Sequence, residues 1–246
     1  MTSTIIELKN VSYGNKKINI LNDINLQIKE NERIALIGKN GSGKSTLISI
    51  LNGSLRPNKG QLKFYNQDYI DLHINQKRNI GTIWQDLRLI EELSVEQNVN
   101  CGLLGRENFL FALRNLLNLS NFKKAHKYLE LCQLSESIYS KNLKQISGGQ
   151  KQKVAIARGI AQEPKILFAD EPFNNLDPKS INQILNLLII KKNSSKIKLP
   201  STVLISLHRI DLLNGFDRVI GIKNGKIFFD LEKSKLSKSK LIKIFC

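Results

Sequence analysis

The sequence predicts an α/β fold with a parallel sheet, an antiparallel β subdomain and an inserted helical subdomain. Three observations predict it. Short apolar runs recur along the chain and each ends in a polar group, which is typical of buried parallel strands. Strand-like segments separated by Asn and Gly occupy the N-terminal region, and a Leu-rich stretch with helical spacing follows between residues 86 and 145.

The N-terminal region contains the segments that favour an antiparallel arrangement. Residues 5–8, 24–28 and 61–65 are strand-like and are separated by Asn and Gly turns. We therefore expect an antiparallel patch beside the main sheet. Near the C-terminus, Asn224 and Gly225 separate two apolar runs, which is a strong hairpin signal.

Four later segments predict the parallel strands. They are IALIG, GTIWQ, ILFADE and TVLISLH, and they end at Gly38, at Gln85, at Asp170 with Glu171, and at His208. Open parallel sheets bind ligands just beyond the carboxyl ends of their strands. We therefore expect these polar ends to converge on one ligand.

The stretch between residues 86 and 145 has apolar residues at helical spacing, for example Phe109, Leu113 and Leu116. This spacing predicts helices, and we expect residues 86–145 to be a helical subdomain inserted into a single domain spanning 1–246. The Lys-rich stretch 191–198 is expected to be a surface loop.

Length and composition indicate an ordinary globular protein. The chain has 246 residues, of which 41% are hydrophobic and 24% charged, enough for one well-buried core. Its longest apolar run, residues 184–190, is far shorter than the roughly 20 residues of a membrane-spanning helix. The N-terminus lacks the features of a secretory signal, so we expect a cytoplasmic location. The three cysteines have no metal-binding spacing and are interpreted as reduced thiols.

The net charge of +17 has three interpretations. Clustered Lys and Arg residues can neutralise nucleic-acid phosphates, and basic surfaces are attracted to anionic membranes. A general bias toward Lys, Asn and Ile gives solvated lysine faces without either partner. We favour this last interpretation, and the charge alone does not decide the function.

The segment GKNGSGKS fits the pattern G-x-x-x-x-G-K-[ST] and lies between an apolar strand and a helical run. Its glycines let successive backbone N–H groups turn inward as an anion nest, which the helix N-terminus reinforces. Lys44 is expected to reach the β and γ phosphates and Ser45 to bind Mg²⁺. The residues expected to bind ATP here are Gly38, Lys39, Asn40, Gly41, Ser42, Gly43, Lys44, Ser45 and Thr46.

Four other groups are expected to act at the γ phosphate together with Lys44. Adjacent carboxylates at a buried strand end are costly unless a cation or substrate uses them. We assign Asp170 to Mg²⁺ and Glu171 to the attacking water. His208 could touch the γ phosphate, although a lone strand-end His is more often structural. Gln85 could sense Mg²⁺ or water, although a lone Gln is weak evidence.

The segment ISGGQ precedes a second amphipathic helix, which has Val154, Ala157 and Ile160 on one face. Its helix N-terminus is suited to an anion. Two anion sites for one triphosphate favour a head-to-tail pair of chains in which each completes the site of the other. The residues of this second site are Ser147, Gly148, Gly149 and Gln150.

In this order, GKNGSGKS, Gln85, ISGGQ, ILFADEP, NNLD and His208 resemble the nucleotide-binding subunits of ABC transporters over nearly the whole chain. The resemblance implies that ATP with Mg²⁺ lies between two identical subunits. It implies that Tyr13 stacks on adenine and that Asp177 lies at the dimer contact. It also implies integral-membrane permease partners and a peripheral position on the cytoplasmic face of the inner membrane.

Within this family the chain most resembles the ATP-binding subunit of phosphonate importers. The more discriminating segments are GLLGR and the serine-leucine-histidine form that ends at His208. This resemblance implies an extracytoplasmic solute-binding protein in the complex. Trp84, Asp86 and Phe173 depart from the usual pattern.

Other cargoes are alternatives, namely phosphate, phosphite, an amino acid or a lipoprotein to be released. A second alternative is a nonmembrane ABC ATPase that acts on ribosomes or nucleic acid. Such proteins usually carry two cassettes or a long coiled coil, which this sequence lacks. We therefore expect no nucleic-acid partner.

Overall fold

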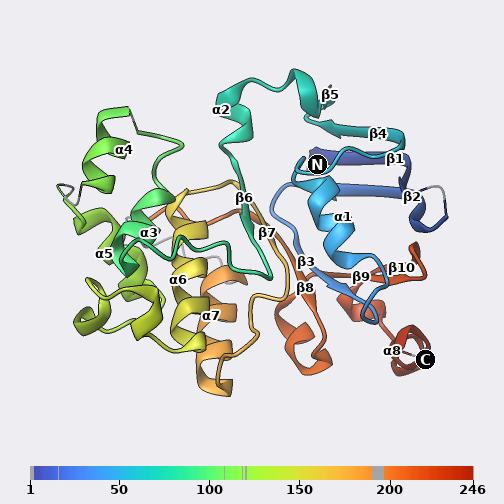
Figure 1. Ribbon diagram of the computed structural model, residues 1–246. Helices are drawn as coiled ribbons and strands as arrows, with labels where there is room; N and C mark the ends of the chain where they lie inside the picture. The colour runs from blue at the N-terminus through green and yellow to red at the C-terminus, as the bar shows by residue number, and fades with distance from the viewer. Residues whose placement is uncertain are drawn as a thin grey trace. The chain divides into compact units, whose positions relative to one another are not determined.

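The computed structural model describes residues 3–15, 17–107, 109–117, 119, 121–189 and 197–245 (Figure 1). The chain divides into two compact units. The first comprises Met1–Lys77, Phe168–Glu171 and Ser201–Cys246, and the second comprises Arg78–Leu167 and Pro172–Pro200. Most of the surface loop predicted at residues 191–198 lies outside the described residues.

An antiparallel sheet forms part of the first unit. Its strands follow the order β2-β1-β4-β5, and β1 pairs antiparallel with both β2 and β4. Ile24, Leu26 and Ile28 alternate with exposed residues along β2, so one face of the strand is buried. The predicted antiparallel patch is confirmed. Its strands are β1 (Thr4–Gly14), β2 (Asn19–Lys29), β4 (Lys59–Phe64) and β5 (Gln67–Asp68).

The first unit also contains most of the main sheet. Strand β3 (Arg33–Ile37) pairs parallel with β8 (Thr202–Leu207) on one side and with β9 (Arg218–Lys223) on the other. Every residue of β3 and β8 is buried, which explains why their sequences are predominantly apolar. Beyond β8 the sheet continues with β7 (Ile166–Ala169), whose second half belongs to this unit.

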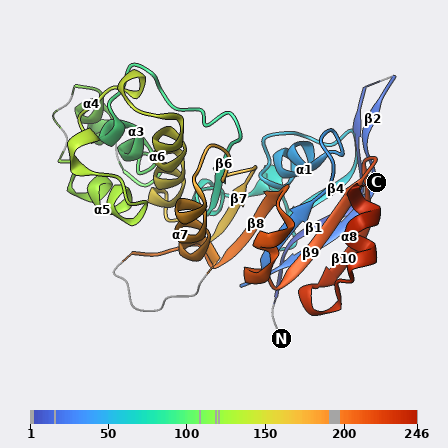
Figure 2. The same ribbon diagram turned by 90° about the horizontal axis from the view of Figure 1, so that it is seen from below.

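The predicted C-terminal hairpin is confirmed. Strand β10 (Lys226–Glu232) pairs antiparallel with β9. The turn residues Asn224 and Gly225 have φ of 49° and 72°, a left-handed backbone that suits these two residue types. Figure 2 shows α8 (Lys238–Phe245) alongside these strands, and its Ile244 is fully buried.

The remaining helices of the first unit follow strands of the two sheets. Helix α1 begins directly after the loop that ends β3, and it buries Leu47, Ile48, Ile50 and Leu51. These helices are α1 (Lys44–Leu51), η1 (Tyr69–Asp71), α2 (Ile74–Lys77), η4 (Ile210–Gly215) and η5 (Lys233–Lys235).

The second unit is mainly helical. Helices α3, α5 and α6 pack against one another (Figure 1), while β6 lies beside the first half of β7. Besides the first half of β7, the elements of this unit are β6 (Ile80–Ile83), α3 (Val95–Cys101), α4 (Phe109–Leu116), α5 (Lys123–Leu131), η2 (Glu136–Ile138), η3 (Leu143–Gln145), α6 (Gly148–Ala161) and α7 (Pro178–Ile189).

Residues 86–145 contain helices α3, α4 and α5, but their apolar residues differ in burial. Tyr128 and Cys132 are buried, whereas Phe109 on α4 is 83% exposed. The boundaries of an inserted subdomain at 86–145, and the single domain spanning 1–246, stay predictions. Within the described ranges, no helix has the length and apolarity needed to cross a membrane.

Candidate active site

The phosphate loop joins β3 to α1 and depends on its glycines. Gly41 and Gly43 have φ of 75° and 107°, values that glycine adopts at little cost. A Cβ atom on Gly43 would also lie 2.7 Å from Leu21 Cδ2, and one on Gly38 would collide with the Ile222 carbonyl oxygen. The glycines in this pattern therefore satisfy steric limits set by β2 and β9 as well as the turn.

The N-terminus of α1 carries no side-chain cap. Gly43 occupies the cap position and supplies no hydrogen bond from a side chain, and the first turn contains no acidic residue. The first N–H groups of a helix have no partner within it, so they can bind an anion. In addition, Ser42 Oγ is buried without a hydrogen-bond partner among the described residues.

Lys44 holds its ammonium group inside this loop. The residue is only 5% exposed, and its Nζ donates to the carbonyl oxygens of Gly38 at 3.0 Å and Lys39 at 3.1 Å. Burial lowers the pKa of Lys44, while the nearby charges of Glu171 and Asp170 oppose this effect. A buried ammonium whose hydrogen bonds go to neutral carbonyl oxygens is well suited to bind phosphate.

Asp170 and Glu171 directly follow β7 and belong to the same unit. Asp170 is 4% exposed and its Oδ1 accepts a hydrogen bond from Ser206 Oγ at 2.6 Å. The same Ser206 oxygen accepts from the backbone N–H of Glu171 at 2.8 Å. Glu171 has a left-handed φ of 48°, and its carboxylate is hydrogen bonded to His208 Nε2.

Three of the four predicted strand ends therefore lie in the first unit. The charges of Asp170 and Glu171 influence Lys44, and Glu171 contacts His208, so these groups form one cluster. The fourth, Gln85, belongs to the second unit and is exposed two residues beyond the end of β6. Its convergence with the others stays a prediction.

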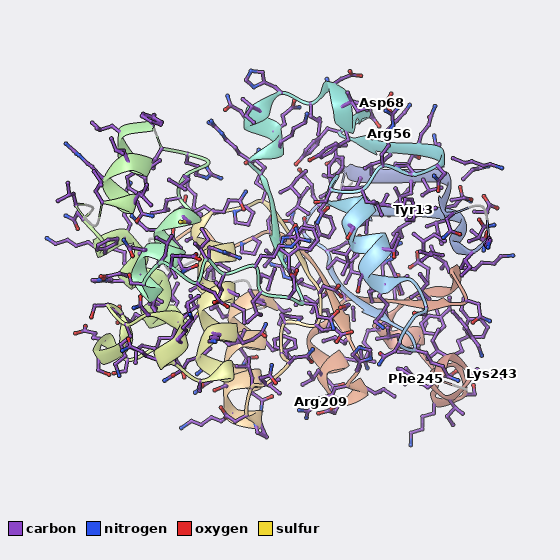
Figure 3. The ribbon with its side chains drawn as sticks, in the orientation of Figure 1. Tyr13, Arg56, Asp68, Arg209, Lys243 and Phe245 are labelled. Carbon is purple, nitrogen blue, oxygen red and sulfur yellow. The ribbon has the colours of Figure 1, made fainter. Side chains whose placement is uncertain are left out.

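The other predicted residues of the first unit lie around the loop. Lys39, Asn40, Gly41 and Ser45 are exposed, and Thr46 is half-buried. Tyr13 lies near the end of β1 (Figure 3), is half-buried, and pairs in register with Leu21 of β2.

The segment 147–150 begins helix α6 in the second unit with a capping box. Ser147 Oγ accepts from the backbone N–H of Gln150 at 3.2 Å, and the Gln150 side chain accepts from the N–H of Ser147 at 2.9 Å. Sequence reasoning assigned both side chains to an anion site and missed this capping role, although the S-x-x-Q spacing signals it. A Cβ on Gly149 would lie 2.8 Å from the carbonyl oxygen of Asn175, so glycine allows the NNLD segment to approach.

Asp177 caps α7 in the second unit. Its Oδ1 accepts from the backbone N–H of Ser180 at 2.9 Å, and hydrogen bonding by Ser180 lowers the pKa of Asp177. Asp before Pro178 at the first helical position is a recognisable helix start. This structural role was missed in the sequence.

The residues after Gln85 are held by Arg158 of α6. Its two terminal nitrogens donate to the carbonyl oxygens of Arg88 and Leu87, each at 2.6 Å. Leu87 and Arg88 both have positive φ, 58° and 47°, and the Arg88 guanidinium lies 3.6 Å from the ring centre of Trp84. Arg158 thus stabilises a strained turn. Nothing in the local sequence signals its contacts with the Leu87 and Arg88 carbonyl oxygens.

Comparison with known families identifies the chain. The profile of the family described as ABC transporter matches residues 21–174, more than half of the sequence. The chain belongs to the ABC transporter family. The phosphate loop, the Asp170–Glu171 pair and the segment 147–150 all lie within the matched residues.

Curated relatives and solved structures agree with this membership. The phosphonates import ATP-binding protein PhnC of Fusobacterium nucleatum is 36% identical over 252 residues, covering 98% of each chain. The lipoprotein-releasing system ATP-binding protein LolD of Rickettsia typhi is 34% identical over 229 residues, covering 92% of this chain and 98% of its own. The dimeric ATP-binding cassette MJ0796, in a post-hydrolysis state with ADP and Pi, has a TM-score of 0.77 and 31% identity, covering 93% of this chain and 98% of its own.

This ABC transporter protein has the α/β fold of the P-loop ATPases, as expected from the sequence. It is an ATPase coupled to transmembrane transport, and its nucleotide is ATP. The buried ammonium of Lys44 lies within the residues that the family profile matches.

Proposed function

We propose that this ATPase powers an importer for phosphonates or related phosphorus oxyanions. The observation that carries this cargo assignment is the 36% identity to a phosphonates import protein over 98% of both chains. The serine-leucine-histidine form ending at His208, with the GLLGR segment, supports it. Lipoprotein release is the second candidate, because LolD of Rickettsia typhi is 34% identical over 92% of this chain.

We propose Ser45, Asp170 and Gln85 as the residues that hold Mg²⁺ with the bound ATP. Mg²⁺ prefers hydroxyl, carboxylate and amide oxygens and usually shares its ligands with phosphates and water, so this set of donors fits. Ser45 adjoins Lys44 at the exposed start of α1, and Asp170 lies beside Ser206 near Lys44. When bound, the cation neutralises charge that develops on the transferring phosphoryl group.

We propose distinct roles for the residues at the γ phosphate. Lys44 binds the β and γ phosphates, Glu171 polarises the attacking water, and His208 contacts the γ phosphate and orients Glu171. The hydrogen bond between His208 and Glu171 supports the last role, because a fixed carboxylate is better placed to accept a proton from water.

We propose that two copies of the chain assemble head to tail around ATP. Residues 147–150 of one copy would face the γ phosphate held by the other, Tyr13 would stack on adenine, and Asp177 would lie at the contact. The dimeric MJ0796 cassette with ADP and Pi supports this assembly. The remaining proposed partners are integral-membrane permease subunits and an extracytoplasmic solute-binding protein, with the ATPase peripheral on the cytoplasmic face of the inner membrane.

Reconstitution tests the cargo. The ATPase is assembled in proteoliposomes with its permease and solute-binding protein, and ATP hydrolysis is measured with methylphosphonate, phosphite, phosphate or a lipoprotein. We expect methylphosphonate to stimulate hydrolysis at the lowest concentration. Stimulation by lipoprotein alone would support the LolD-like function and overturn the phosphonate proposal.

A further inference from the structure

Ser206 on β8 links the two acidic residues of the site. It is fully buried, donates to Asp170 Oδ1 at 2.6 Å and accepts from the Glu171 N–H at 2.8 Å. A hydroxyl has one proton, and a backbone N–H can only donate. The Ser206 proton must therefore point at Asp170, so both of these contacts are fixed in direction.

Ser206 and His208 stand two residues apart at the C-terminal end of β8. Ser206 is the fifth residue of β8, and His208 directly follows Leu207, the last residue of the strand. Ser206 contacts the Asp170 carboxylate and the Glu171 backbone, whereas His208 contacts the Glu171 carboxylate. The end of one strand thus holds both acidic residues.

The Glu171 backbone needs such support. Its φ of 48° lies in the left-handed region, which a side chain other than glycine adopts only where the surroundings fix it. The hydrogen bond from its N–H to Ser206 is one of those restraints. The direction in which the Glu171 carboxylate leaves the chain therefore depends on Ser206.

We propose that Ser206 is a positioning residue for ATP hydrolysis. Its hydroxyl orients the Asp170 carboxylate toward the cation and, through the Glu171 backbone, aims the Glu171 carboxylate at the attacking water. The proposal rests on the roles proposed above for Asp170 and Glu171. It also gives a physical reason for the serine in the serine-leucine-histidine segment.

Thr202 provides a matched control on the same strand. It is 1% exposed, and its hydroxyl accepts from the backbone N–H of Asn31 at 3.0 Å. It lies four residues before Ser206, and its hydroxyl is hydrogen bonded to Asn31 rather than to the acidic pair. Thr202→Val therefore removes a buried hydroxyl from β8 while leaving the two Ser206 contacts in place.

The test compares the variants Ser206→Ala, Ser206→Thr and Thr202→Val of the 246-residue chain. For each variant we measure kcat, the Mg²⁺ concentration that gives half the maximal rate, and the affinity for ATP by titration without Mg²⁺. Loss of an outer-shell partner typically costs about 10- to 100-fold. We expect Ser206→Ala to lower kcat and raise the Mg²⁺ requirement by that order, with ATP affinity unchanged. Ser206→Thr should recover most of the rate, and Thr202→Val should keep it.

A kcat for Ser206→Ala close to that of the wild type, or an equal loss in Thr202→Val, would overturn the positioning role. If circular dichroism shows that Ser206→Ala does not fold, Ser206→Cys replaces it in the comparison, because a thiol is a weaker hydrogen-bond donor of similar size. Asp170→Asn and Glu171→Gln are measured in parallel. Full activity in those two variants would show that the proposed roles fail, independently of Ser206.

Discussion

His208 donates a hydrogen bond from Nε2 to the Glu171 carboxylate. An ionised carboxylate can only accept, so Nε2 must carry the proton in this arrangement. His208 adjoins a strand and is about one-third exposed, whereas the Glu171 side chain is 12% exposed. The imidazole therefore fixes a mostly buried carboxylate from the solvent side.

The first prediction concerns this hydrogen bond. We expect His208→Ala to lower kcat by about 10- to 100-fold, because the Glu171 carboxylate loses the partner that orients it. His208→Gln keeps an N–H donor and should recover part of the rate. Steady-state ATPase assays of both variants provide the measurement, and equal losses in the two would argue against an orienting donor.

The second prediction concerns Glu171 itself. Glu171→Gln keeps the shape of the side chain but removes its ability to take a proton from water. We expect turnover to fall by roughly 10² to 10⁴, the usual span for general-base help, while ATP binding persists. The measurement pairs single-turnover hydrolysis with equilibrium ATP titration, and an unchanged rate in the reconstituted complex would exclude the role.

The third prediction concerns the buried ammonium of Lys44. Lys44→Ala should weaken ATP binding by at least about 100-fold, since a desolvated charged hydrogen bond to phosphate is lost. Equilibrium titration with ATP measures the loss. Lys226→Ala, an exposed lysine on β10, should bind ATP like the wild type, and similar losses in both variants would point to general electrostatics instead.

The fourth prediction uses the same residue to test stability. Burial lowers the pKa of Lys44, so the folded state disfavours its charge relative to the unfolded state. Lys44→Met, which keeps the aliphatic stem, should raise the free energy of unfolding of the nucleotide-free chain. Because the folded pKa is depressed, the wild type should gain stability as pH rises toward 10.5, the ordinary lysine value, and the variant should lack this gain. Urea unfolding at several pH values measures both effects.

The fifth prediction concerns the Arg158 contacts. Arg158→Lys retains the charge but cannot donate to both the Leu87 and Arg88 carbonyls as a planar fork. We expect a loss of about 1.5–3 kcal/mol in the free energy of unfolding, the range for a hydrogen bond to a charged group. Urea denaturation measures it, with the exposed Arg114→Lys as control. Faster hydrogen exchange at residues 85–88 in Arg158→Lys alone would confirm where the support is lost.

Local sequence was sufficient wherever the physical cause is local. Buried strands β3 and β8 have predominantly apolar sequences, and the turn at Asn224 and Gly225 has residues that tolerate positive φ. The phosphate loop was equally readable, because its glycines and Lys44 stand in one short segment. The capping roles of Ser147 and Asp177 also have local signals, namely the S-x-x-Q spacing and the Asp before Pro178.

The sequence by itself determined the strands, the helix starts and the residue types of the nucleotide site, because strand burial, turn conformation and phosphate binding depend on neighbours in the chain. Only the tertiary structure decided which distant groups meet. Ser206 reaches Asp170 across 36 positions, and Arg158 reaches Leu87 across 71. Hydrogen bonds act over about 3 Å, so such partners are selected by the way strands and helices pack and leave no periodic trace in the sequence.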